Sequence, residues 1–486
     1  MQLLEVLIWI GVIVFALFML GVTIAAHELG HLLFAKWRGM VVEKFAIGFG
    51  PLIWKKNWAG IEWSVRALPF GGFVSLPQMA TMETVEGKTD QPQHNYPAAK
   101  PQDKILAAVG GPLFSFLFGV LVAVVVWIVG KPEPESAATT VVGYVLPDSP
   151  AATAESPILP GDKIIAVNNQ FVSSFSATAD NIIEAIVLST GPTIQFDIER
   201  PSRTGGIELV TTDIAPMRDE VFNVRRVGIS PASAVIVGQI APGSPAERAG
   251  LKTGDRILRV NFAPVFSPEH FADIVNDSGG QQLTLELVRD GKEMILVGFP
   301  QFEEKNQRYM LGFSFEPPPT TVVHLSPANL VIRSMLMIKR TVGAITNPQS
   351  DIKAEHLSGP VGIISNQARL ARQDIRLLLW FLVILNVNLA ILNLLPLPVL
   401  DGGHIVFSLI EWIMRRPLPV RLVESVQTVF ALLLIGFMLY VTFHDSLREY
   451  KLYQRNSEAE SAVQPLETLN FQETQQSSER PAPTQQ

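Results

Sequence analysis

Three ionisable residues stand close together near the start of the chain, in the segment His27-Glu28-Leu29-Gly30-His31. Side chains four positions apart share one face of a helix, so both imidazoles can reach one metal ion. A carboxylate beside the first histidine can take a proton from water bound to that ion, which is the chemistry of zinc-dependent peptide hydrolysis. The segment therefore predicts a metal site with His27 and His31 as ligands and Glu28 as general base.

A third ligand is expected elsewhere, because a hydrolytic zinc ion usually has three protein ligands and one water. The chain contains no cysteine, so this ligand must be His, Asp or Glu. Residues 393–404 carry both an aspartate and a histidine at the end of an apolar segment that contains Pro396 and Pro398. Proline frees backbone groups that hydrocarbon cannot satisfy, so a site is the economical explanation. Asp401 is the predicted third ligand, and His404 is the alternative.

Three apolar segments are long enough for the roughly 20 helical residues that cross a bilayer, and a fourth, shorter one is long enough if its flanks are counted. They cover residues 6–26, 105–130, 377–400 and 428–443. Only 17% of the residues are charged, which argues against an ordinary cytosolic enzyme. The net charge of −7 supplies no general basic field, so no nucleic-acid partner is expected. We expect a polytopic α-helical membrane protein with about four transmembrane helices.

Basic residues suggest an orientation, because Lys and Arg near membrane ends favour the cytoplasmic side. They gather in residues 36–66, after the first apolar segment, and in residues 415–421, between the last two. This distribution places the N-terminus outside the cytoplasm and exports residues 131–376. The histidine pair then lies near the cytoplasmic end of the first span.

The exported block contains an internal repeat. Ser-Pro-Ala at residues 149–151 and Gly-Asp at 161–162 recur at residues 244–246 and 254–255. Short β-branched runs alternate with Gly and Pro around both copies, which is typical of strands separated by turns. The two copies resemble a tandem pair of PDZ domains, which are α/β modules.

PDZ domains bind extended peptides by adding a strand to a sheet edge. The resemblance implies that the second module binds peptides through the loop Ala249-Gly250-Leu251. The first module has Ser-Pro-Ile at residues 156–158 and a short insertion in place of this loop. Closed modules that act only as spacers remain the alternative.

Residues 61–66 alternate between apolar and polar side chains, which predicts a strand, and Gly71-Gly72 predicts a bend. A strand edge at Gly71, Gly72 and Phe73 could hold an unwound substrate through backbone hydrogen bonds. Asn393 is a neutral amide within an apolar segment. It could join neighbouring helices or bind a substrate carbonyl.

These features together resemble the site-2 protease family of intramembrane zinc metalloproteases, and in particular its members with tandem PDZ domains. The resemblance rests on the His-Glu-x-x-His segment, the Asn-x-x-Pro-x-Pro-x-Leu-Asp-Gly pattern at residues 393–402 and the modules between spans two and three. It implies one Zn²⁺ per chain held by His27, His31 and Asp401, with Glu28 as base. It also implies a membrane-associated β-hairpin at residues 60–77.

The same resemblance implies a function. The enzyme would cleave a single-span membrane protein substrate, such as an anti-sigma factor, after an upstream site-1 protease has trimmed it. Its location would be the bacterial cell inner membrane, within the lipid bilayer, with the PDZ-like modules periplasmic and the active site near the cytoplasmic side. The modules would act as a size filter or bind peptides. The alternatives are a membrane-anchored PDZ scaffold or pseudoprotease without catalysis, and a membrane-anchored zinc protease with a soluble catalytic domain.

The expected domain organisation follows the chain. It comprises residues 1–130 with spans one and two, 137–216 as PDZ-like module 1, 223–316 as PDZ-like module 2, 326–376 as an amphipathic linker, 377–456 with spans three and four, and 457–486 as a disordered tail.

Overall fold

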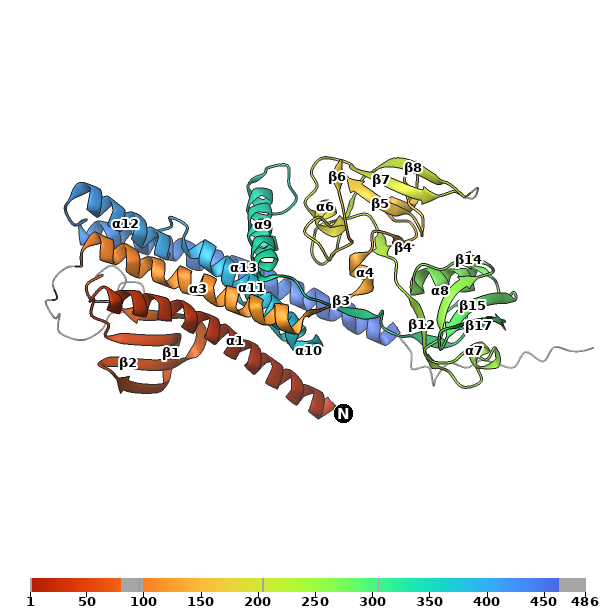
Figure 1. The fold of residues 1–486 in the computed structure, drawn as a ribbon, viewed down its shortest axis with the longest axis horizontal. Coiled ribbons are helices and arrows are strands. Elements are labelled where there is room, and N and C mark those ends of the chain that lie inside the picture. The colour runs from red at the N-terminus through yellow and green to blue at the C-terminus, as the bar shows by residue number, and fades with distance from the viewer. Residues whose placement is uncertain (1, 80–95, 97–98, 203–204, 305, 463–486) are drawn as a thin grey trace, which may run out of the picture. The chain divides into compact units, whose positions relative to one another are not determined.

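The computed structural model describes residues 2–79, 96, 99–202, 205–304 and 306–462. The chain divides into two compact units. One comprises Met1–Glu133 with Val322–Lys451, and the other Pro134–Thr321 with Leu452–Gln486. The first, called the membrane unit here, carries the long apolar helices, and the second carries the internal repeat (Figure 1).

Long helices build the membrane unit. They are α1 (Gln2–Trp37), α3 (Pro101–Val129), α9 (Pro327–Thr346), α10 (Pro360–Gln373), α11 (Ile375–Asn393), α12 (Asp401–Met414) and α13 (Val420–Ala462), with a short 3-10 helix η1 at Ala354–His356. Helix α3 packs against α1, α11 and α12, and Figure 1 shows it running alongside α1. The helices that bear the candidate site residues are therefore assembled around α3.

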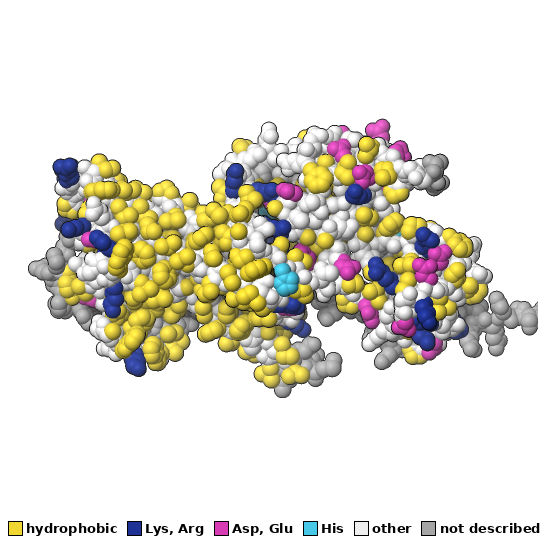
Figure 2. Space-filling model, in the orientation of Figure 1, with side chains coloured by type: hydrophobic (Ala, Val, Ile, Leu, Met, Phe, Trp, Pro, Cys, Tyr) yellow, Lys and Arg dark blue, Asp and Glu magenta, His cyan; other side chains and the backbone are white. Residues whose placement is uncertain are grey.

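Four segments of these helices are long and apolar enough to cross a bilayer: Val6–Trp37, Pro101–Val129, Ile375–Asn393 and Val420–Glu458. This confirms the number of spans expected from the sequence. Hydrophobic side chains cover the face of the membrane unit seen in Figure 2. A water-soluble protein rarely exposes a continuous apolar surface of this extent, so this surface is explained by contact with lipid.

Two of the differences between the helix boundaries and the expectations from the sequence have a clear local cause. Helix α11 ends at Asn393, because Pro396 and Pro398 in the segment that follows cannot donate backbone hydrogen bonds. Helix α13 continues to Ala462 and so includes residues 457–462, which were expected to be disordered. Ala and Glu extend an existing helix without a new nucleation cost. Residues 463–486 of the expected tail lie outside the described residues.

Strands β1 (Lys44–Trp58) and β2 (Ile61–Ser75) form an antiparallel hairpin, joined at Ala59 and Gly60 with positive φ angles of 53° and 78°. The hairpin was expected at residues 60–77, but its first strand begins at Lys44, and residues 61–75 supply only its second strand. Ala46 pairs with Ser64 on one side and with Phe73 on the other. The first part of β1 therefore lies between the two halves of the bent strand β2. The second half of β2 forms an outer edge of this small sheet and contacts α1.

The first copy of the repeat folds around its own apolar core. Its elements are β4 (Val142–Val145), α5 (Pro150–Thr153), β5 (Lys163–Val167), β6 (Gln170–Phe171), α6 (Ile182–Val187), β7 (Ile194–Pro201), β8 (Ile207–Ile214), β9 (Met217–Arg218), β10 (Arg225–Arg226) and β11 (Ile229–Pro231). The main sheet has the order β6-β5-β7-β8, and β11 pairs with β4. Strand β3 (Lys131–Pro134), which pairs with β20 (Thr320–Val323), and helix α4 (Glu135–Ala138) precede this copy.

The second copy repeats this arrangement around a second core. Its elements are β12 (Val235–Ile240), α7 (Pro245–Arg248), β13 (Arg256–Val260), β14 (Ala263–Pro264), α8 (Pro268–Asp277), β15 (Leu283–Arg289), β16 (Lys292–Gly298), β17 (Gln301–Glu303), β18 (Arg308–Met310) and β19 (Phe313–Phe315). Its sheet has the order β16-β15-β13-β12-β19. In both copies the last strand returns to pair with the first.

The boundary between the two copies lies later in the chain than expected. Residues 223–231 were assigned to the second module, yet β11 pairs with β4 and the buried Val227 belongs to the core of the first copy. The reason is tertiary, because a strand distant in sequence completes the first sheet. The boundary expected at residue 223 is therefore wrong.

Candidate metal centre

Helix α1 presents His27, Glu28 and His31 in its last turns, and all three residues are buried. The backbone of α1 comes very close to α3 at this level. A Cβ atom added to Gly30 would lie 2.1 Å from the carbonyl oxygen of Gly110. Glycine at both positions therefore permits the contact that buries the metal-binding turn of α1.

Asp401 is the first residue of α12 and is also buried. The glycines that follow it allow this helix to begin directly against the loop after α11. A Cβ atom would lie 2.1 Å from the carbonyl oxygen of Leu395 if added to Gly402, and 2.2 Å from that of Leu397 if added to Gly403. Side chains at either glycine would therefore push Asp401 away from its position.

Two polar contacts hold this segment in place. Lys104 of α3 forms an ion pair of 2.9 Å with Glu411 of α12, and both side chains are largely buried. On the other side, Gln427 Nε2 of α13 donates to the carbonyl oxygen of Pro398 at 3.3 Å. The helix that carries Asp401 is thus linked to α3 and to α13.

The folded chain brings three expected ligands together. His27 Nε2 lies 3.2 Å from Asp401 Oδ2, and His31 Nε2 lies 3.3 Å from Asp401 Oδ1. The two Nε2 atoms are 3.2 Å apart. Among the described residues, these side chains form the group with metal-ligand geometry, with ligand atoms within 4.8 Å of one another.

These residues fit a zinc ion. Tetrahedral zinc with bonds of about 2.1 Å places its ligand atoms roughly 3.4 Å apart, close to the separations observed. Asp401 Oδ2 is buried and has no hydrogen-bond partner, despite its proximity to His27. A buried carboxylate oxygen without a partner is costly, and a metal ion at this position would compensate it.

Glu28 lies beside the second half of β2. A Cβ atom added to Gly72 would lie 2.8 Å from Glu28 Cγ, and one added to Gly71 would lie 2.4 Å from a ring carbon of Phe49. Gly71 also has a positive φ of 85°, which favours glycine. The structure therefore brings the predicted strand edge, with Gly71, Gly72 and the buried Phe73, next to the predicted base.

The polar residues of segment 393–404 lie in different environments. Asn393 Nδ2 lies 3.3 Å from His27 Nε2, so this amide belongs to the site. His404 points elsewhere, because its Nε2 lies 3.5 Å from Gln427 Nε2. The structure brings Asp401, and not the alternative ligand His404, to the histidine pair.

The loop Ala249-Gly250-Leu251 lies in the second unit. Leu251 is buried in the core of the second copy, and the carbonyl oxygen of Gly250 accepts a hydrogen bond of 2.8 Å from Arg289. The backbone nitrogens of all three residues donate within the adjacent turn. Peptide binding at this loop stays a prediction.

The contacts that α3 makes with the histidines were not predicted from the sequence. His27 Nδ1 lies 2.9 Å from Ser115 Oγ, and His31 Nδ1 donates to the carbonyl oxygen of Ala107 at 2.9 Å. A Cβ atom at Gly111 would lie 2.2 Å from His31 Nε2. The spacing of Ala107, Gly111 and Ser115 by four residues could have indicated this contact, because it places small residues on one face of α3, where another helix can pack closely.

Comparison with known proteins agrees with this geometry. The model of peptidase family M50 matches residues 15–437. The regulator of sigma-E protease RseP of Escherichia coli is 30% identical over 448 residues, covering 88% of this chain and 97% of the relative. A putative zinc metalloprotease of Vibrio cholerae is 29% identical over 462 residues, with 88% and 97% covered. Another from Neisseria meningitidis is 28% identical over 451 residues, with 89% and 97% covered.

A match over most of the chain excludes a chance occurrence of the His-Glu-x-x-His pattern, and the metal-ligand cluster is intact. The family match and the intact cluster also argue against a PDZ scaffold without catalysis. A soluble catalytic domain is also excluded, because the histidine pair lies within a candidate membrane span. The chain therefore belongs to peptidase family M50, the site-2 proteases, and is a zinc metalloprotease.

Proposed function

We propose that this protease hydrolyses a peptide bond within the transmembrane segment of a single-span membrane protein. The observation that carries the proposal is the position of Glu28 and the cluster of His27, His31 and Asp401 on apolar helices of the membrane unit. Ionisable groups are costly at membrane depth and are retained there for function. A peptide bond that reaches them must come from a substrate within or at the edge of the bilayer.

His27, His31 and Asp401 would hold the zinc ion. When bound, zinc lowers the pKa of a coordinated water and polarises the scissile carbonyl. The Glu28 carboxylate would act as general base towards the attacking water and then as general acid, passing the same proton to the departing amide nitrogen. Asn393, whose amide lies at the site, donates a hydrogen bond to the substrate carbonyl.

The substrate must be extended, because a helix occupies its own carbonyl groups with hydrogen bonds. The second half of β2 offers a strand edge beside Glu28, at Gly71, Gly72 and Phe73. An unwound substrate segment adds to this edge and is held through its backbone. Glycine at position 72 leaves the space that a substrate backbone needs next to the base.

The regulatory setting is supported by the relative from Escherichia coli, which is named regulator of sigma-E protease RseP. The substrate is accordingly an anti-sigma-factor type of protein, already trimmed by a site-1 protease. The distribution of Lys and Arg supports an inner-membrane topology with the active site near the cytoplasmic side. The repeated modules are then periplasmic, and their shared strand order supports a PDZ-like identity.

Cleavage of a model single-span protein by purified protease tests the proposal. Glu28→Gln should retain zinc and lose turnover, because an amide cannot take a proton from water. Glu62→Gln serves as the control, because Glu62 forms only a surface ion pair with Lys55. Undiminished cleavage by zinc-loaded Glu28→Gln would contradict the assignment of the base.

A further inference from the structure

The two ring nitrogens of His27 face different partners. Nε2 lies in the metal-ligand cluster, 3.2 Å from Asp401 Oδ2. Nδ1 lies 2.9 Å from Ser115 Oγ, on the opposite side of the ring. Ser115 is completely buried on α3, so water does not compete for this contact. The hydroxyl therefore defines the environment of the nitrogen that does not face the cluster.

A neutral imidazole carries one N–H, and the other nitrogen has a lone pair. A zinc ligand must direct that lone pair at the metal, and the partner of the other nitrogen decides which tautomer is present. In the tautomer that directs the Nε2 lone pair at the metal, His27 Nδ1 carries the hydrogen, and the Ser115 oxygen is placed to accept its hydrogen bond. Without this acceptor, the buried Nδ1–H would lack a partner.

His31 is held in a different way. Its Nδ1 donates to the carbonyl oxygen of Ala107, a backbone group that a side-chain substitution does not remove. Ala107, Gly111 and Ser115 are spaced by four residues, so one face of α3 supports both rings. His31 therefore contacts a backbone carbonyl group of α3, whereas His27 contacts a side-chain hydroxyl group.

We propose that Ser115 is a positioning residue that holds His27 in the tautomer and ring orientation required for zinc binding through Nε2. The proposal rests on the ligand set given under the proposed function. It assigns Ser115 no contact with substrate and no part in proton transfer. Its effect should therefore appear in zinc affinity, before any effect on substrate binding.

The experiment measures zinc affinity of the full-length protein in detergent, by competition with a chromogenic chelator. Ser115→Ala should lower the affinity about 10–100-fold, the loss typical of an outer-shell partner. Ser115→Thr keeps the hydroxyl and should retain most of the affinity. The control is Ser334→Ala, because Ser334 is also a buried helical serine of the membrane unit but bonds only the carbonyl of Leu330.

A second readout separates positioning from general stability. The cobalt-substituted enzyme should show an altered visible spectrum in Ser115→Ala and the wild-type spectrum in Ser334→Ala. Equal zinc affinity of Ser115→Ala and wild type would overturn the proposal. So would equal losses in Ser115→Ala and Ser334→Ala, or in Ser115→Ala and Ser115→Thr.

His27→Ala distinguishes failure of this proposal from failure of the ligand set. If His27→Ala loses zinc while Ser115→Ala retains it, the ligand set stands and the role of Ser115 is wrong. If His27→Ala itself retains wild-type zinc affinity, the ligand set under the proposed function is wrong as well.

Discussion

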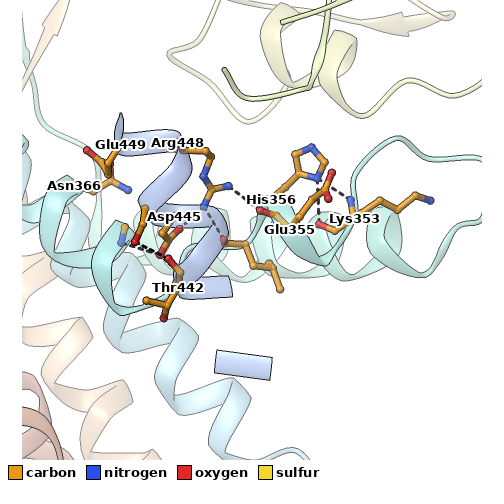
Figure 3. A network of polar contacts seen from close by, with 12 residues as sticks. Lys353, Glu355, His356, Asn366, Thr442, Asp445, Arg448 and Glu449 are labelled. Carbon is orange, nitrogen blue, oxygen red and sulfur yellow. Dashed lines mark hydrogen bonds and ion pairs between the residues drawn. The ribbon is translucent and has the colours of Figure 1, made fainter. Parts of the chain in front are cut away.

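Asp445 Oδ2, on α13, accepts a hydrogen bond of 2.8 Å from the backbone nitrogen of Gly362, in the first turn of α10. The same oxygen accepts a second bond of 2.8 Å from Gly359, and Arg448 completes the contact by donating to Asp445 and to the backbone of Leu357. Figure 3 shows Asp445 and Arg448 projecting from α13 towards this segment. The buried carboxylate therefore anchors the last helix to α10.

Gly362→Ala should loosen this anchor, because the new Cβ atom would lie 2.8 Å from Asp445 Oδ1. We expect local opening of the C-terminal half of α13 to become easier by about 1–3 kcal/mol, the cost of an unsatisfied buried group. Hydrogen exchange of the amides around Asp445 measures this change. Gly436→Ala is the control, since its Cβ would meet nothing within 4 Å; similar exchange in both variants would contradict the anchor.

Asp401→Ala should reduce zinc affinity by more than the roughly 10–100-fold typical of outer-shell changes, because it removes a direct ligand. His404→Ala should leave the affinity nearly unchanged, because His404 faces Gln427. Metal analysis of both purified variants after dialysis against a chelator makes the comparison. Zinc loss in His404→Ala alone would reverse the assignment.

Gly111→Ala should abolish zinc binding, because its methyl group would occupy space within 2.2 Å of His31 Nε2. The matched control is Gly21→Ala on α1, where a Cβ would meet nothing within 4 Å. Both variants replace a helical glycine in an apolar span, so helix propensity changes equally. The measurement is zinc content per chain, and wild-type content in Gly111→Ala would show that α3 shifts to accommodate the methyl group.

Asp255, in the second copy of the repeat, is buried and receives two hydrogen bonds of 2.6 Å from Arg289. Burial raises the pKa of Asp255, but hydrogen bonds from Arg289 and from the Lys252 backbone hold it below the usual value. A carboxyl with a lowered folded-state pKa contributes stability above its unfolded pKa of about 3.9, and loses it as pH falls through the folded value.

Arg289→Met should therefore destabilise the second copy by about 3–5 kcal/mol at neutral pH, because the Asp255 charge stays buried without a partner. The difference from wild type should shrink as the pH falls from neutral, because Asp255 buried without its arginine takes up a proton at a higher pH than the paired carboxyl of the wild type. Hydrogen exchange in β13 and β15, measured against urea and pH in the full chain, reports this free energy. Arg259→Met, which disrupts an exposed pair with Glu286, should cost at most about 1 kcal/mol.

Deletion of residues 140–315 with a short replacing linker tests whether the repeated modules restrict access. If they act as a size filter, the deletion variant should cleave an untrimmed single-span substrate that the intact protease rejects, because the bulk that collides with its external domain is gone. Zinc content and cleavage of a trimmed substrate establish that the variant is active. Rejection of the untrimmed substrate by an active variant would favour peptide binding as the role of the modules.

The chemistry of the site was largely predictable from local sequence. Two histidines four residues apart share a helical face in any α-helix, so His27, Glu28 and His31 needed no tertiary information. The apolar spans followed from the length of uncharged segments, but the third was expected to continue to residue 400, whereas α11 ends at Asn393, before the two prolines. The repeat was visible as the recurring sequence around Asp162 and Asp255.

Tertiary structure decided which distant groups meet. Asp401 and His404 both lie on the first turn of α12, and packing against the loop after α11 turns only Asp401 towards His27. Ser115 is one of several polar residues in apolar spans, and its partner is defined only once α1 packs on α3. The boundary near residue 223 was misplaced for the same reason, because β11 completes a sheet with β4. Local periodicity is set by the backbone of each segment, whereas these contacts depend on how complete helices and strands pack against one another.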